Sequence, residues 1–117
     1  MTPRLAASAR IVLLALFLSS CGGATASQPV ATNEVDLPPS YVFRPAAISV
    51  TAGTTVTWTN HDNFTHSVRL VDDGNRVVGV MRPGESTRFT FSKPGTFHYD
   101  CSFHPQNMHG TVTVSSG

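Results

Sequence analysis

The sequence has few cysteines, little charge and no long hydrophobic run. Two cysteines in 117 residues allow at most one disulfide, which excludes a scaffold held together by many disulfides. Charged residues make up 13% of the chain, with 8 Lys+Arg against 7 Asp+Glu and no basic run, whereas nucleic acid is bound by clustered basic residues. The apolar stretch at residues 11–18 is too short to cross a bilayer. We therefore expect one small domain that binds no nucleic acid.

The N-terminal segment has the pattern of an export signal. Two arginines precede the apolar residues 11–18, as in a charged region followed by a short hydrophobic region. The next residues, Leu18-Ser19-Ser20-Cys21-Gly22, resemble the bacterial lipobox. This resemblance implies that residues 1–20 are removed and that Cys21 becomes a lipidated N-terminus. We therefore expect the protein in the bacterial cell envelope, lipid-anchored on the periplasmic side or at the cell surface.

The lipobox resemblance implies different chemical states for the two cysteines. If Cys21 carries lipid, Cys101 has no disulfide partner, and an unpaired thiol in an oxidising compartment suggests that a metal occupies it. The alternative is a plain secretory signal, with Cys21 later bridged to Cys101.

Residues 22–40 consist largely of Gly, Ala, Thr, Ser, Gln and Pro and show no apolar period. This composition is typical of a flexible tether. The sequence thus predicts a signal peptide at 1–20, a lipidated tether at 21–40 and one folded domain at 41–117. A domain of that size has a marginal core, and a bound metal is a common supplement.

Apolar and polar residues alternate through the predicted domain, as they do in half-buried strands. Turn sequences rich in Gly, Pro and Asp separate the alternating segments at intervals of about ten residues. This pattern predicts an all-β domain, an antiparallel sandwich or barrel. Inward parity places four aromatic residues in its core: Trp58, Phe89, Phe91 and Phe97.

A thiol, an imidazole and a thioether lie close together at Cys101, His104 and Met108, on the connection between two predicted strands. This soft donor set favours copper over calcium or magnesium, while zinc remains possible through the Cys and His. A local loop rarely completes a metal site, so we expect another ligand from elsewhere. His66 is the candidate, because it shares the inward parity of Val68 and Leu70.

The remaining residues of interest have simpler interpretations. His61 lies in a polar turn, and His98 shares an exposed face with Thr96, so neither is expected to bind metal. A methionine in a β loop is more often a packing residue than a ligand, and the neighbouring Cys and His are what favour Met108 as a ligand.

The segment from Phe43 to Val114 resembles the cupredoxins, in particular the small plastocyanin, pseudoazurin and amicyanin type of blue copper protein. The matching features are the Pro83-Gly84 and Pro94-Gly95 turns, the Phe97-x-Tyr99-x-Cys101 strand, the Cys-x-x-His pair and Met108-x-Gly110. The resemblance implies a cupredoxin-like Greek-key sandwich of eight strands. It also implies one type 1 copper ion held by His66, Cys101 and His104, with Met108 as a long axial ligand.

Two departures from the family pattern leave alternatives open. Three residues separate His104 from Met108, whereas amicyanin-like loops have two and plastocyanin-like loops have four. The four-residue spacing would make His109 the ligand, as in a red copper site, but Met108 shares the parity of Gly110 and Val112. Ser67 stands where the family often has an asparagine that bonds the cysteine-bearing segment, and its hydroxyl either replaces that hydrogen bond or leaves it unmade.

The two resemblances, to the lipobox and to the cupredoxins, together imply a membrane-tethered protein that carries single electrons between redox partners. His104 would present its ring edge at the surface and make small, transient contacts with them, and we expect a monomer. The chain shows no acid/base pair and no Ser/His/Asp set, so we expect no enzymatic activity. Two alternatives are a copper carrier that delivers the ion, and a structural or adhesive β-sandwich lipoprotein with a vestigial site.

Overall fold

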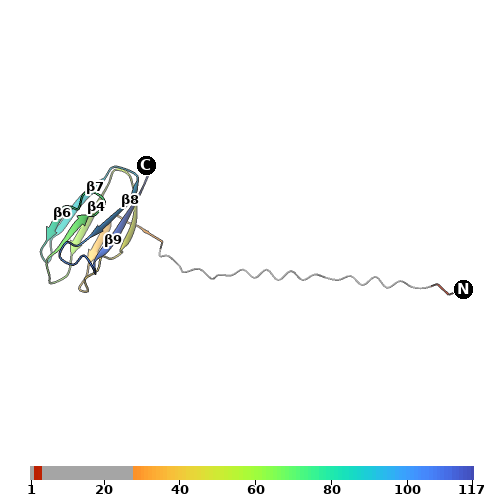
Figure 1. Cartoon of the computed structure of the whole chain (residues 1–117), viewed down its shortest axis with the longest axis horizontal. Coiled ribbons are helices and arrows are strands. Elements are labelled where there is room, and N and C mark those ends of the chain that lie inside the picture. Colours follow the sequence, from red (N-terminus) through yellow and green to blue (C-terminus); the bar gives the residue numbers. More distant parts are fainter. Residues whose placement is uncertain (1, 4–27) are drawn as a thin grey trace.

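The structure is a computed structural model that describes residues 2–3 and 28–117. Its regular secondary structure is entirely β (Figure 1). Within these residues, no helix has the length and apolar character needed to cross a membrane. Nine strands are formed: β1 Val30–Ala31, β2 Glu34–Leu37, β3 Ala47–Thr51, β4 Thr54–Asn60, β5 His66–Leu70, β6 Arg76–Met81, β7 Ser86–Phe91, β8 Gly95–Asp100 and β9 His109–Ser115.

The strands form two sheets that pack as a sandwich. The larger sheet has the order β1-β3-β9-β8-β5-β6, and the smaller has the order β2-β4-β7. Strand β4 shows the alternation that builds such a layer, because Val56, Trp58 and Asn60 are buried while their neighbours face outward. On its outer face, the hydroxyls of Thr55 and Thr90 pair across β4 and β7 at 2.7 Å.

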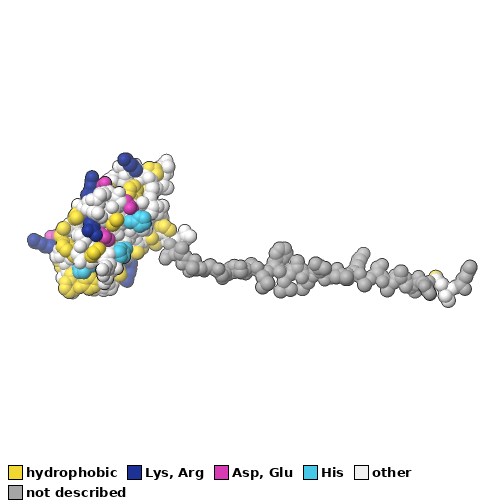
Figure 2. All heavy atoms as spheres, viewed as in Figure 1, with side chains coloured by type: hydrophobic (Ala, Val, Ile, Leu, Met, Phe, Trp, Pro, Cys, Tyr) yellow, Lys and Arg dark blue, Asp and Glu magenta, His cyan; other side chains and the backbone are white. Residues whose placement is uncertain are grey.

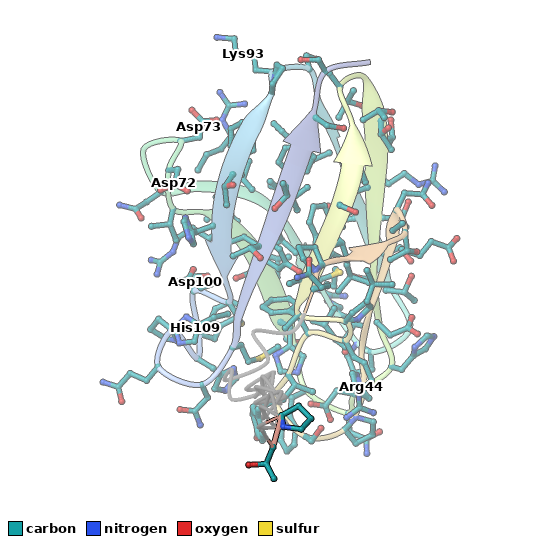
Figure 3. The ribbon with its side chains drawn as sticks, turned by 90° about the vertical axis from the view of Figure 1, so that its right-hand side faces the viewer. Arg44, Asp72, Asp73, Lys93, Asp100 and His109 are labelled. Atoms are coloured by element: carbon teal, nitrogen blue, oxygen red, sulfur yellow. The ribbon has the colours of Figure 1, made fainter. Side chains whose placement is uncertain are left out.

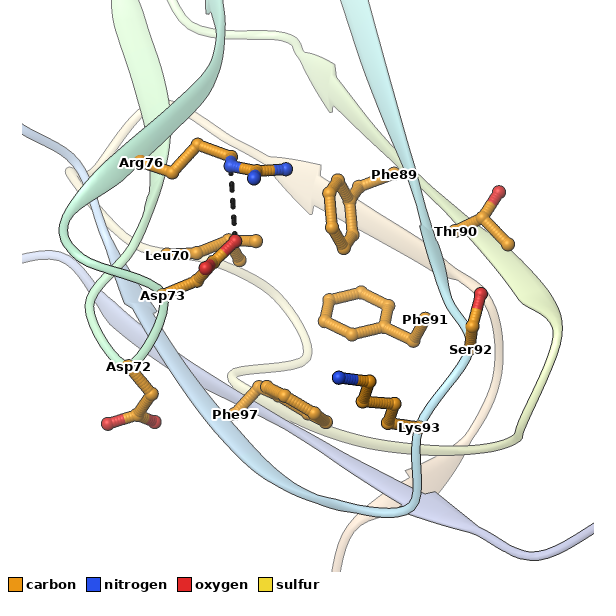
Figure 4. A pocket seen from close by; sticks show the side chains of 10 residues that line it. All are labelled: Leu70, Asp72, Asp73, Arg76, Phe89, Thr90, Phe91, Ser92, Lys93 and Phe97. Atoms are coloured by element: carbon orange, nitrogen blue, oxygen red, sulfur yellow. Dashed lines mark ion pairs between the residues drawn. The ribbon is translucent and has the colours of Figure 1, made fainter.

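The core aromatic residues predicted from parity all pack inward, to different depths. Trp58 and Phe91 are buried, whereas Phe89 and Phe97 are partly buried against the core. Ring centroids of Phe89 and Phe97 lie 5.0 Å and 5.3 Å from that of Phe91. Figure 4 shows the reason for their exposure: these rings line a surface hollow whose rim carries Lys93 and other charged side chains.

The predicted all-β, cupredoxin-like sandwich is confirmed, but the sheets are mixed rather than antiparallel throughout. The pairs β1·β3, β2·β4 and β3·β9 are parallel, and β4·β7, β5·β6, β5·β8 and β8·β9 are antiparallel. Alternation in a sequence identifies strands, but it does not identify the neighbour that each strand acquires when the chain crosses between sheets.

The predicted start of the folded domain at residue 41 is wrong, since β1 and β2 belong to it. Val35 and Leu37 are 1% and 0% exposed and form part of the core, although residues 21–40 were expected to be a tether. A four-residue strand with two apolar positions is too short to stand out among polar residues. Cys21 and all of the predicted signal segment except residues 2–3 lie outside the described residues.

Strand register brings two distant segments together at one end of the sandwich. Arg69 of β5 pairs with Asp100 of β8, so residues 101–104 run on beside the start of β5. Asp100, which is only 7% exposed, also pairs with the exposed His109 across β8 and β9, and Figure 3 shows the two side chains near each other. The chain therefore makes a loop at residues 101–108 that leaves β8 beside the start of β5 and returns to the sheet as β9, on the other side of β8.

Candidate metal centre

His66 begins β5 with its side chain fully buried, as its parity predicted. Its Nδ1 lies 3.8 Å from the Sγ of Cys101. Its other ring nitrogen, Nε2, lies 2.8 Å from Oδ2 of Asp62. Because a carboxylate accepts a hydrogen bond, Nε2 carries the proton and the lone pair of Nδ1 faces the cysteine sulfur.

Asp62 is itself fixed by its neighbours and is only 5% exposed. Its backbone N–H donates to Oδ1 of Asn60 at 2.9 Å, and its Oδ1 accepts from the N–H of Asn63 at 2.7 Å. Burial alone would raise the pKa of the Asp62 carboxyl, but the hydrogen bonds from His66 and the Asn63 N–H outweigh it and lower the pKa below its ordinary value. Asp62 could not be recognised from the sequence, because a carboxylate in a polar turn carries no sign of its partner.

Cys101 follows β8, is fully buried and has no disulfide partner among the residues that the structure describes. The backbone N–H of Ser67 donates to its Sγ at 3.4 Å, and the Ser67 hydroxyl lies 3.8 Å from the same sulfur. The Ser67 Oγ also accepts from the N–H of Ser102 at 2.8 Å and lies 2.6 Å from the Ser102 hydroxyl. The sequence left open whether the Ser67 hydroxyl makes the hydrogen bond of the family's asparagine. The structure contains this bond, and it connects β5 to the cysteine-bearing segment.

His104 lies on the loop after Cys101, is partly exposed and directs Nδ1 to within 3.7 Å of the cysteine sulfur. The loop is held by its own backbone: the N–H of His104 donates to the carbonyl of Cys101 at 3.1 Å, and the N–H groups of Asn107 and Met108 donate to the carbonyl of His104 at 3.1 and 3.0 Å. One ligand atom each from His66, Cys101 and His104 lies within 4.8 Å of the others.

Met108 and His109, the two alternatives for a further ligand, have different surroundings. Met108 is fully buried, and its carbonyl accepts from the N–H of Cys101 at 3.3 Å. His109 is exposed, and its Nε2 lies 3.1 Å from the carbonyl oxygen of Gln106. Met108 therefore lies on the interior side of the loop and His109 on the solvent side.

The other two histidines of the described chain lie apart from this cluster. His61 pairs with Asp36 at 3.5 Å, with both side chains more than half exposed. His98 donates its backbone N–H to Asp72 at 2.7 Å, and its ring Nδ1 lies 2.8 Å from the same carboxylate. Both pairs are at the surface, as predicted for His61 from its polar turn and for His98 from its parity.

Aromatic side chains surround the exposed side of the cluster. Phe64 and Phe103 are each 54% exposed, and Tyr41 lies with its ring centroid 4.7 Å from that of His104. Figure 2 shows hydrophobic side chains gathered at the end of the sandwich away from the C-terminus. The cluster thus lies beneath an apolar surface.

The donor set fits copper. A thiolate with two imidazoles is the trigonal set that type 1 copper prefers, and a buried thioether is the weak donor that accompanies it. Structural zinc sites close with four Cys or His ligands, whereas this cluster brings together three.

Comparison with known proteins agrees with this chemistry. Plastocyanin from Scenedesmus fuscus is 34% identical over 84 residues, covering 62% of this chain and 86% of that protein. The solved structure of a purple cupredoxin from Nitrosopumilus maritimus matches with a TM-score of 0.64 at 29% identity, covering 72% of this chain and all of that one. A Cu(I) form of an amicyanin mutant matches with a TM-score of 0.65 at 28% identity, covering 77% of this chain and 88% of that one.

Coverage differs among relatives, since the chain spans 50% and 58% of the length of two chloroplastic plastocyanins that it also matches. The family description "Cupredoxin-like domain" matches residues 9–114, which is most of the chain. With a matching fold and a Cys-His-His cluster of the right chemistry, this protein belongs to the cupredoxin family of copper-binding proteins.

Proposed function

We propose that this protein carries single electrons between redox proteins in the bacterial cell envelope, with a type 1 copper ion held by His66, Cys101 and His104 and, axially, by Met108. The single observation that carries the proposal is the convergence of three donor atoms within 4.8 Å of one another, from two segments that are far apart in the chain. Bound copper supplies the one-electron Cu(II)/Cu(I) couple. The residues of the chain supply a site whose ligand positions would change little when the bound ion gains or loses an electron.

The site is rigid because each ligand is held by a second contact. Asp62 fixes the ring of His66, and Ser67 fixes the sulfur of Cys101. The backbone hydrogen bonds of the loop fix His104 and Met108. Groups held in this way need little rearrangement when an electron arrives or leaves, which favours fast transfer.

Electrons are proposed to enter and leave at His104, the one member of the cluster that is partly exposed. The apolar side chains of Phe64 and Phe103 beside it are each 54% exposed and offer a surface without charge. Such a surface supports brief contact with a partner, as expected of redox encounters that bury little area. Catalysis on a substrate is not part of the proposal.

The envelope location rests on the sequence. The export signal at 1–20 and the lipobox-like residues ending at Cys21 support a lipid anchor on a monomeric domain. Mass spectrometry of the mature N-terminus tests this, because a diacylated Cys21 is expected. A mature chain without lipid would overturn the anchor and leave the copper site untouched. A disulfide between Cys21 and Cys101 would overturn both the anchor and the copper site, because it removes the thiolate ligand.

The test of the electron-transfer function is a comparison of spectra and rates. The copper-loaded protein should show an intense visible thiolate-to-copper absorption band and the small copper hyperfine splitting of a type 1 centre. It should also exchange electrons rapidly with itself. Absence of the band would contradict the proposal. A normal band with slow electron exchange and rapid delivery of copper to an acceptor would instead identify a copper carrier.

A further inference from the structure

One aromatic side chain touches both histidines of the cluster although it lies far from them in the sequence. Tyr41 is in the connection between β2 and β3. Its ring meets that of His104 edge-on, with centroids 4.7 Å apart and planes at 69°, and that of His66 edge-on at 5.8 Å and 88°. The two imidazoles lie 5.4 Å from each other. Tyr41 therefore spans the pair.

We propose that Tyr41 is a positioning residue for electron transfer, which holds the imidazole of His104 in one orientation and covers the metal centre against water. This inference rests on the proposed function of the site. His66 is already fixed by its strand and by Asp62, whereas His104 is on a loop and partly exposed. Of the two rings that Tyr41 touches, that of His104 is the less restrained, so a contact with Tyr41 restricts its orientation more.

The backbone of Tyr41 is held in an unusual conformation. Its φ is +55°, and Asn75 is the other non-glycine residue of the described chain with a positive φ. A bulky aromatic residue rarely adopts this left-handed region, and such conformations persist where the surroundings enforce them, often at functional sites. This conformation directs the ring toward the histidines.

Neighbouring contacts enforce that conformation. Two residues further on, Phe43 is only 3% exposed and packs edge-on against Tyr99 at 4.8 Å. The backbones of Asp36 and Arg44 exchange two hydrogen bonds of 2.8 Å, which close the segment that contains Tyr41. The backbone segment that carries Tyr41 is thus held to the core through Phe43 and to β2 through the backbone of Arg44.

Phe64 stacks on the ring of Tyr41. The two rings stack with centroids 5.6 Å apart and an interplanar angle of 25°. Phe64 is 54% exposed, whereas Tyr41 is partly buried against the core. Tyr41 is therefore the more buried ring of this pair and the one that meets both imidazoles, and a tyrosine with two side-chain torsions is a rigid filler there.

Three variants of the full-length protein test this role. Tyr41→Asn removes the ring but suits a positive φ, because asparagine adopts the left-handed region more readily than other non-glycine residues. Tyr41→Phe keeps the ring and removes the hydroxyl. Phe64→Leu is the matched control, because it removes an exposed aromatic from the same surface without removing the ring that touches His104. Thermal unfolding of each variant checks that it folds.

The first readout is nuclear magnetic resonance of the metal-free protein. In the wild type, the ring protons of His104 should show cross-relaxation to Tyr41 and ring-current shifts, with one narrow set of signals. We expect Tyr41→Asn to move and broaden the His104 signals, while Tyr41→Phe and Phe64→Leu leave them in place. Unchanged His104 signals in Tyr41→Asn would overturn the proposal.

The second readout is the electron self-exchange rate of the copper-loaded protein. Tyr41→Asn should lower the rate about tenfold, the change that corresponds to about 1.4 kcal/mol in the activation barrier. Tyr41→Phe should keep the wild-type rate, and Phe64→Leu should lose less than Tyr41→Asn. An equal loss in Tyr41→Asn and Phe64→Leu would mean that both act only through the contact surface, and would overturn the positioning role. A wild-type protein without the thiolate-to-copper band would instead refute the proposed function itself.

Discussion

The hydroxyl of Ser67 accepts a hydrogen bond from the backbone N–H of Ser102 at 2.8 Å, and this bond ties β5 to the loop that begins at Cys101. The same hydroxyl lies 3.8 Å from the Cys101 sulfur, and the Ser67 backbone N–H donates to that sulfur at 3.4 Å. One serine therefore both supports the ligand-bearing segment and adds positive potential at the sulfur.

Replacing Ser67 by alanine removes the acceptor for the Ser102 N–H and one donor near the sulfur. We expect copper affinity to fall by about 10- to 100-fold, the usual effect of losing a contact that supports a ligand. The reduction potential should also fall, because hydrogen bonds to a thiolate withdraw electron density that otherwise favours Cu(II). Chelator competition and voltammetry measure both quantities. The control is Ser86→Ala, which breaks an exposed hydroxyl pair with Thr59; equal effects in both variants would contradict the expectation.

Removing the carboxylate of Asp62 should loosen the imidazole of His66. The 2.8 Å contact to Nε2 sets both the tautomer and the orientation of the ring. We expect Asp62→Ala to weaken copper binding by about 10- to 100-fold, measured by competition with a Cu(I) chelator.

Asp36→Ala is the matched control for Asp62→Ala. Asp36 also pairs with a histidine, His61, but the side chains are 61% and 57% exposed. An exposed ion pair contributes about 0–1 kcal/mol, so Asp36→Ala should leave copper affinity unchanged. A wild-type affinity in Asp62→Ala would show that the strand alone orients His66.

Leucine substitutions at Met108 and His109 separate the two alternatives for the axial ligand. Met108→Leu nearly conserves buried volume, at a cost of less than about 1.5 kcal/mol, but removes the thioether sulfur. We expect altered absorption and paramagnetic resonance spectra and a higher reduction potential, because a weak axial donor tunes the potential of such sites. His109→Leu changes an exposed side chain and should leave the spectra as in the wild type. The reverse result would assign the axial position to His109.

Tyr99 makes stability depend on alkaline pH. Its hydroxyl and the indole N–H of Trp58 are buried without hydrogen-bond partners among the described residues. Burial raises the pKa of Tyr99 to about 12, whereas an unfolded tyrosine titrates near pH 10. Tyr99 binds its proton more tightly in the folded state than in the unfolded state. Its contribution to the free energy of unfolding is therefore complete below about pH 10 and is lost as the pH rises toward about 12.

Tyr99→Phe tests that assignment. Chemical unfolding at pH 8 and pH 11 should show a smaller decrease in the free energy of unfolding for the variant than for the wild type. At neutral pH the variant should be as stable as the wild type or about 1 kcal/mol more stable, because it removes an unpaired buried hydroxyl. A clear loss of stability at neutral pH would reveal a hydrogen bond from Trp58.

Local patterns were enough to find the strands and the candidate ligands. Alternation around His66 placed its side chain inward, and the same reasoning placed His98 outward, because successive side chains of a strand point to opposite faces. The spacing of Cys101 and His104 was visible because both lie on one short loop. Alternation did not show that Val35 and Leu37 belong to the core, since a strand that short looks like its polar surroundings.

Contacts between segments that are distant in the sequence could not be predicted from these local patterns. Asp62 reaches His66 only because a turn folds back beside β5, and Tyr41 reaches both imidazoles only because its segment is closed by the Asp36 and Arg44 backbones. Neither residue type signals its partner in the sequence.

The sequence by itself determined the all-β architecture, the soft donors of the cluster and the inward direction of His66, because these follow from side-chain chemistry and from the two-residue period of a strand. Tertiary structure alone decided which strands became neighbours, how near His66 and Cys101 came to each other, and which side chains hold the ligands in place. The physical reason is that distances between remote residues depend on how the whole core packs, and local periodicity carries no information about that packing.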